Sequence, residues 1–321
     1  MQKYLSKTDF SRWMTCPAAA YYGWSGRESK NESDAFLRYL AEEGQTVGRM
    51  ARQLFANAEF IEEKGLEAAY RTTRARIQDD CTLFEACVIE GDFVVRPDIL
   101  IRKDSRSYII EVKSKVGNLR QHREGKMLIN MHGDVRAAYK EVGCDLAFQV
   151  EVLRQAFPNL MIVPYFLLPE ETSLAQEAEV KAVRGEEQIV VSKLDRDTIN
   201  RWRSDSALKF FPAHKAIERI KVATAATMTA MAKAWQSEKR PGPLLKYRCR
   251  NCELRLKGAV GKNDDHGIRT AIPSARRLRR DAGVSRDDKW KRGRLPENEG
   301  SHRHFAPQLR HPRQRQPVDH L

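Results

Sequence analysis

Two acidic and two basic side chains occupy positions at which a buried β-strand would be apolar. They are Arg96 and Asp98 in one β-like run, and Glu111 and Lys113 in the next. Two neighbouring carboxylates repel each other unless a proton or a cation lies between them. Mg²⁺ and Mn²⁺ prefer carboxylate oxygens, keep several waters and accept phosphate oxygens. This combination of residues predicts a divalent-metal site.

The elements that must position these side chains are two strands, residues 93–101 and 108–114, joined by a tight turn. If the turn is centred between residues 104 and 105, Asp98 faces Glu111 and Arg96 faces Lys113. Opposed residues share one face of a sheet, with β-carbons about 4.5–5.5 Å apart. The opposite face is then apolar throughout, formed by Val95, Pro97, Ile99, Ile101, Tyr108, Ile110 and Val112.

Three further groups complete the predicted site. The carbonyl of Val112 lies between Glu111 and Lys113 and is a possible third metal ligand. The Lys113 ammonium is placed to orient a water or to stabilise a charged transition state. Glu85 joins the charged face if Glu90 and Gly91 form a two-residue turn. The alternative interpretation is a solvent-facing strand pair with salt bridges from Asp98 to Lys113 and from Glu111 to Arg96.

The remaining pattern predicts an α/β protein with a central mixed sheet, an antiparallel meander and flanking helices. Ser6 to Asp9 is typical of a helix start, and Cys16-Pro17 of a helix end or turn. Gly44 is a possible helix break, and Pro164 indicates a strand edge or bulge. The predicted helices are residues 34–56, 62–80, 145–157 and 213–236. The other predicted strands are 82–89 and 160–168, with 188–192 as a further candidate.

The spacing Pro97-Asp98, twelve residues, then Glu111-Val112-Lys113 resembles the core of PD-(D/E)XK nucleases of the RecB-like branch. The segments LSKTDFSRWMTCP, EEGQTVGRMARQLF and DLAFQVEVLR occur in the same order as in an uncharacterised bacterial domain family. That family is related to CRISPR-associated iron–sulfur exonucleases. The resemblance covers roughly residues 4–256 and implies a restriction-endonuclease-like core.

The resemblance also implies a role for each matching residue. Asp98 and Glu111 are expected to be metal carboxylates, Lys113 the catalytic lysine, Gln149 a residue that organises the site or contacts DNA, and Glu85 an accessory acid. The chain departs from the family pattern at two positions: Gly48 replaces a histidine of the first helix, and Leu153 replaces a tyrosine. These departures favour one Mg²⁺ or Mn²⁺ ion rather than two.

Some relatives hold a [4Fe–4S] cluster, and Cys16, Cys249 and Cys252 match three of its four ligands. A C-x-x-C pair on a polar turn is a fair cluster signal. The sequence has no Cys after Cys252, so the fourth ligand is not found. The alternatives are a buried thiol for Cys16, and an ordinary thiol pair or a zinc half-site for the other two.

The composition favours a polyanionic partner, since the net charge is +14. Residues 257–321 contain 16 Lys and Arg against 8 Asp and Glu, so they contribute more than half of that excess. Their composition indicates a disordered tail, either out of frame with an ancestral gene or a replaced segment. The expected division is a nuclease core at 1–169, a helical region ending in CxxC at 170–256, and the tail. Neither a signal peptide nor a membrane span is evident, so a cytoplasmic location is expected.

The expected function is metal-dependent hydrolysis of DNA, with an exonuclease in repair or defence as one form of it. The alternative is a degenerate nuclease fold that binds nucleic acid without cutting it. A third possibility is non-specific binding by the basic tail alone.

Overall fold

The computed structural model describes residues 3–26, 35–55, 57–171 and 206–242. Its centre is a six-stranded mixed sheet in the order β1-β2-β5-β6-β7-β8. The β1–β2 and β6–β7 pairs are parallel and the other three are antiparallel. The strands are β1 (Glu59–Phe60), β2 (Cys81–Phe84), β5 (Ile99–Lys103), β6 (Arg106–Val112), β7 (Met161–Pro169) and β8 (Leu208–Pro212), and β3 (Val88–Glu90) with β4 (Phe93–Val95) forms a separate hairpin.

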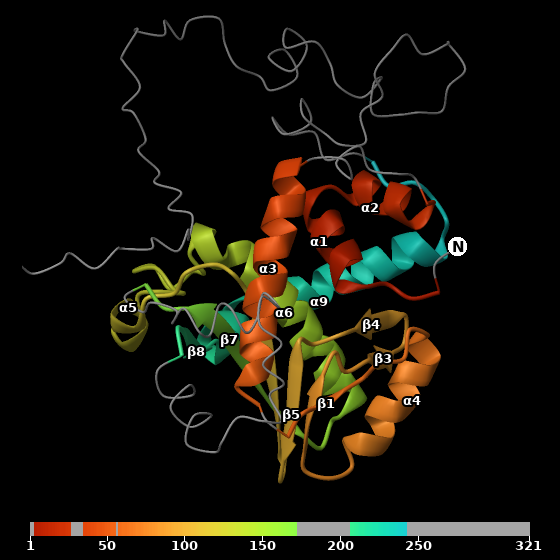
Figure 1. Ribbon diagram of the computed structural model, residues 1–321. Helices are drawn as coiled ribbons and strands as arrows, with labels where there is room; N and C mark the ends of the chain where they lie inside the picture. Colours follow the sequence, from red (N-terminus) through yellow and green to blue (C-terminus); the bar gives the residue numbers. More distant parts are fainter. Residues whose placement is uncertain (1–2, 27–34, 56, 172–205, 243–321) are drawn as a thin grey trace, which may run out of the picture.

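Helices cover both faces of this sheet, which confirms the predicted α/β class with a mixed central sheet (Figure 1). On one face α3 (Ala35–Gln53) packs Val47, Met50 and Ala51 against Phe84, Ile99 and Ile110. On the other face lie α6 (Ala137–Ala156) and α9 (His214–Gln236), joined by α1 (Lys7–Thr15) and α2 (Pro17–Trp24). The shorter helices are α4 (Leu66–Arg76), which packs beside β3, and α5 (Leu119–Arg123), which packs beside β8.

The α1–α6 contact matters for the site because it fixes the N-terminal segment on the sheet. Phe10 of α1 and Phe148 of α6 are both fully buried, and their rings stack with centroids 4.8 Å apart. Burying an aromatic side chain of this size contributes about 1.5–3 kcal/mol. Leu5 adds a parallel bridge to Phe93, with Val94 N donating to Leu5 O at 2.9 Å. The residues between these two contacts therefore have little freedom.

The β5–β6 hairpin has the predicted register. Ile99 pairs with Ile110, and the turn falls at residues 104 and 105. Asp104 adopts a left-handed backbone with φ of 54°, which Asp tolerates better than most residues. The ladder ends at the pair of Ile99 and Ile110, and the same register makes Asp98, one position beyond it, the counterpart of Glu111.

Two long strands expected from the sequence are each divided in the structure. Residues 82–89 break at Glu85, whose φ is 54°, and residues 93–101 break at Arg96 to Asp98, where Pro97 has no N–H to donate. The pieces pair in different sheets.

Two smaller expectations were also wrong. The helix α3 runs through Gly44 without a break, and β7, which carries Pro164, lies inside the sheet between β6 and β8. Pro164 is tolerated there because the ladder with β8 stops at Tyr165.

Part of the predicted helical region joins the same core as the strands before it. β8 pairs with β7, and α9 packs along α6. The predicted strand at 188–192, Cys249, Cys252 and the basic tail lie outside the described residues, so the proposed domain limits stay predictions. None of the described helices is both long enough and apolar enough to cross a bilayer.

Candidate active site

The candidate site is centred on Glu111, near the end of β6, where the sheet meets α1 and α6. The Glu111 side chain is fully buried, and both of its oxygens are bonded. Oε1 accepts from Lys7 Nζ at 2.7 Å and from Lys113 Nζ at 2.8 Å. Oε2 accepts from Gln149 Nε2 at 2.6 Å. Three of the residues that the sequence predicted for one site (Glu111, Lys113 and Gln149) are therefore in direct contact.

Asp98 lies opposite Glu111 and completes the predicted carboxylate pair. Its Oδ2 accepts from the backbone N–H of Val112 at 2.7 Å. Burial, and then the charge of Glu111, raise the pKa of Asp98 to about 7. Burial also acts to raise the pKa of Glu111, but Lys7 and Lys113 outweigh it and lower that pKa to about 2. The two carboxylates therefore have opposite tendencies at neutral pH: Glu111 is ionised, and Asp98 readily holds a proton.

A third acid, Asp145, lies beside Lys113 and was not predicted from the sequence. Ser11 Oγ donates to its Oδ1, and Lys113 Nζ is 3.9 Å from its Oδ2. Burial raises the pKa of Asp145. Asp145 precedes Gln149 by four residues on α6, so the two share a helix face. That spacing was the available signal, because Gln149 was already a predicted site residue.

Lys7 is the second residue that sequence reasoning missed. It is the first residue of α1, whose start is fixed by a capping box in which Ser6 and Asp9 bond each other's backbone N–H. The capping pattern predicts the helix start, but no local signal indicates that Lys7 reaches a carboxylate 104 positions away. Its place depends on how α1 docks against α6.

The other predicted members of the charged face do not join the cluster. Arg96 donates instead to the backbone carbonyls of Glu85, at 3.1 Å, and Ile61, at 3.3 Å. The Glu85 side chain forms an ion pair with Arg52 at 3.3 Å. The backbone N–H of Glu85 donates to the backbone carbonyl of Asp98 at 3.3 Å. The break in both strands turns these side chains away. Among the described residues, the predicted salt bridges from Asp98 to Lys113 and from Glu111 to Arg96 are replaced by the Lys113–Glu111 pair.

The structure also describes several positions that the sequence linked to a metal ion or an iron–sulfur cluster. Within the described residues, no three His, Cys, Asp or Glu side chains form a group that could hold a metal ion. A side chain at Gly48 would meet open space, and Leu153 is fully buried in the core. Cys16 is a half-buried free thiol between α1 and α2, packed near Ala18 and Tyr22.

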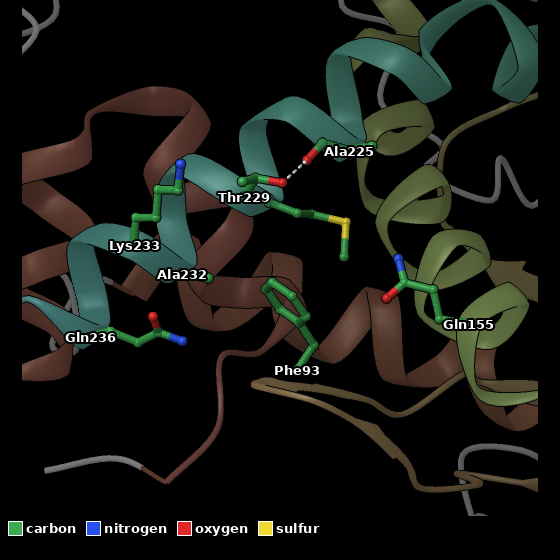
Figure 2. Close-up of a pocket in the computed structure, with 8 residues that line it drawn as sticks. Phe93, Gln155, Ala225, Thr229, Ala232, Lys233 and Gln236 are labelled. Carbon is green, nitrogen blue, oxygen red and sulfur yellow. Dashed lines mark hydrogen bonds between the residues drawn. The ribbon is translucent and has the colours of Figure 1, made fainter.

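A separate pocket of about 330 Å³ lies where β4, α6 and α9 meet (Figure 2). It contains no carboxylate and none of the predicted site residues. Its lining is formed by Phe93, Gln155, Ala225, Met228, Thr229, Ala232, Lys233 and Gln236. The candidate active site is therefore the charged cluster and not this pocket.

Comparisons with known proteins give no family for this chain. No model of a known protein family matches it, and a search of curated proteins finds no significant match.

Proposed function

We propose that this chain is a divalent-metal-dependent nuclease that hydrolyses DNA, with a restriction-endonuclease-like core of the RecB-like PD-(D/E)XK type. The observation that carries the proposal is the convergence of Asp98, Glu111 and Lys113, with Gln149 bonded to Glu111. A solvent-facing salt-bridge ladder would leave such carboxylates exposed. Here the central one is fully buried.

The donor set suits one Mg²⁺ or Mn²⁺ ion held by Asp98 and Glu111. Gln149 Oε1 is buried beside them and has no hydrogen-bond partner among the described residues, which leaves one more hard oxygen for a cation or its water. The Val112 carbonyl remains a predicted third ligand. When bound, the ion would activate a water and polarise the phosphate. Because the two carboxylates repel each other and Asp98 readily takes up a proton, a cation between them would relieve that repulsion.

The reaction needs little from the protein beyond positioning and charge. The oxygen of a water forms a bond to phosphorus and that water loses a proton to solvent, the bond from phosphorus to the leaving oxygen breaks, and the leaving oxygen takes up a proton from solvent. Lys113 can orient the water or balance the charge that develops on phosphate. Gln149 holds Glu111 in one orientation, and Ser11 does the same for Asp145.

The segment that leaves the site after Lys113 supports a polyanionic substrate. Lys115 lies over the ring of Tyr139. Arg120 and Lys126 both form ion pairs with Glu124, and their side chains are largely exposed, so that this group of three keeps a net positive charge. This segment runs to α5 at one margin of the sheet, beside β8 (Figure 1). Exposed lysine and arginine of this kind bind phosphates without reading sequence.

One observation favours the alternative of binding without cutting. Lys7 and Lys113 both occupy Oε1 of Glu111, so the buried charge is already neutralised without a metal. A protein that had lost catalysis could keep this arrangement for binding alone. Strongly salt-dependent DNA binding with no metal-dependent cleavage would select that alternative.

The test is a cleavage assay on labelled linear and circular DNA, single- and double-stranded, with Mn²⁺, Mg²⁺ or EDTA. We expect cleavage only with a divalent ion and its loss in Lys113→Ala. The matched control is Lys103→Ala, an exposed lysine of the same hairpin, which should cut normally. Metal-independent cleavage, or full activity in Lys113→Ala, would refute the assignment.

A further inference from the structure

Lys7 is the cation at the site that the proposed chemistry does not yet use. Its ammonium is 2.7 Å from Glu111 Oε1, but its side chain keeps 26% of its surface exposed, while the Glu111 side chain keeps none. The carboxylate is thus sealed inside the protein, whereas the lysine side chain that bonds it is partly exposed to solvent. A group in that position can touch a ligand that cannot itself enter the core.

Lys7 also has unused hydrogen-bonding capacity. An ammonium carries three N–H donors, and among the described residues Lys7 spends one of them, on Glu111. Lys113 already bonds the same oxygen at 2.8 Å and lies between Glu111 and Asp145. One cation is enough to balance Glu111, so the second leaves positive charge and free donors beside that carboxylate.

The position of Lys7 is fixed by the backbone on both sides. Leu5 is bridged to β4, Ser6 and Asp9 form the capping box, and Phe10 is stacked on Phe148. The Lys7 ammonium is therefore held beside Glu111 by a fixed helix start. A lysine on a flexible N-terminal arm would not be restricted to this position. Preorganised donors of this kind lose little entropy when they bind a ligand.

We propose that Lys7 is a phosphate-binding residue of this site, whose ammonium contacts a non-bridging oxygen of the backbone phosphate lying over Asp98 and Glu111. This inference rests on the proposed function, since it takes nucleic acid as the ligand. The competing explanation is that Lys7 only neutralises Glu111. In that case its loss would lower stability but would not change the number of phosphate contacts.

The experiment measures binding of a fluorescein-labelled single-stranded oligonucleotide in EDTA across a salt series. Lys7→Gln should weaken binding by about five- to tenfold and lower the slope of log K against log salt by about one contact. Lys7→Arg should keep the wild-type slope. The control is Lys3→Gln. Lys3 is an exposed lysine on the same N-terminal segment as Lys7 and is ion-paired with Glu67, so its replacement should change neither the affinity nor the slope.

The inference is overturned if Lys7→Gln binds with the wild-type affinity and slope. If Lys7→Gln fails to fold, the double variant Lys7→Gln/Glu111→Gln removes the buried charge of Glu111 as well and is compared with Glu111→Gln alone by the same slope. Wild-type protein that binds no oligonucleotide refutes both this inference and the proposed function. Cleavage by wild type with unchanged binding in Lys7→Gln refutes this inference alone, and a reduced slope without any cleavage refutes only the hydrolysis.

Discussion

Gln149 reaches across from α6 and donates to the buried Oε2 of Glu111 at 2.6 Å. The bond joins a helix to a strand 38 positions away, and it leaves Oε1 for the two lysines. Glu111 therefore has a single orientation, set by a neutral donor on one side and by two cations on the other. Such an arrangement positions a carboxylate before any ligand arrives.

Replacing Gln149 by Leu should lower the free energy of unfolding by about 1–3 kcal/mol, because Oε2 of a buried carboxylate loses its donor. The matched control is Gln155→Leu, on an exposed turn of the same helix, which should change stability little. Urea denaturation at neutral pH measures both. Equal stability of the two variants would show that the hydrogen bond from Gln149 to Glu111 does not stabilise the fold.

Asp98 makes stability depend on pH in a defined direction. Its pKa is 3.8 in the unfolded chain and about 7 in the folded protein, so the folded state binds more protons in between. Its contribution to stability is full below about pH 4 and is lost as the pH rises through 7. Asp98→Asn removes the buried charge, and should be about 1–3 kcal/mol more stable than wild type at pH 8 and equal to it near pH 4. Thermal unfolding at the two pH values is the measurement, and a difference independent of pH would contradict this account.

The hairpin could be predicted because its information is local. An alternating apolar pattern and a two-residue turn at Asp104 define the register, and the register places Asp98 opposite Glu111. Lys7 and Asp145 could not be placed in the same way, since their positions depend on how α1 and α6 dock. The strand breaks at Glu85 and Pro97 were missed because a strand pattern does not reveal where a chain changes sheets.

Mn²⁺ should stabilise the protein against heat, because an ion between Asp98 and Glu111 relieves their repulsion and binds only the folded state. Asp98→Asn and Glu111→Gln should lose that stabilisation. Asp104→Asn, an exposed turn residue at a backbone angle that Asn also tolerates, should keep it. The shift should be larger at pH 8 than at pH 6, since at lower pH the ion must displace the proton on Asp98. Equal shifts in all four proteins would place the ion elsewhere.

Gly117 tests the packing beside the site. A β-carbon at this position would lie 2.5 Å from the ring of Phe211, which is fully buried in β8. Gly117→Ala should therefore destabilise the protein by about 1–3 kcal/mol through overpacking. In Gly44→Ala the new methyl group meets open space in the middle of α3, so a small stabilisation is expected. Chemical denaturation of both variants measures the contrast, and equal effects would argue against the close approach.

The most direct test of the central claim is single-turnover cleavage of end-labelled DNA in Mn²⁺ by wild type, Asp98→Asn and Glu111→Gln, each confirmed as folded by circular dichroism. Removing a metal carboxylate typically lowers the rate by orders of magnitude. We predict at least about a hundredfold loss in both variants, with Asp104→Asn cutting at the wild-type rate. If both variants cut as fast as wild type, Asp98 and Glu111 are not the catalytic pair.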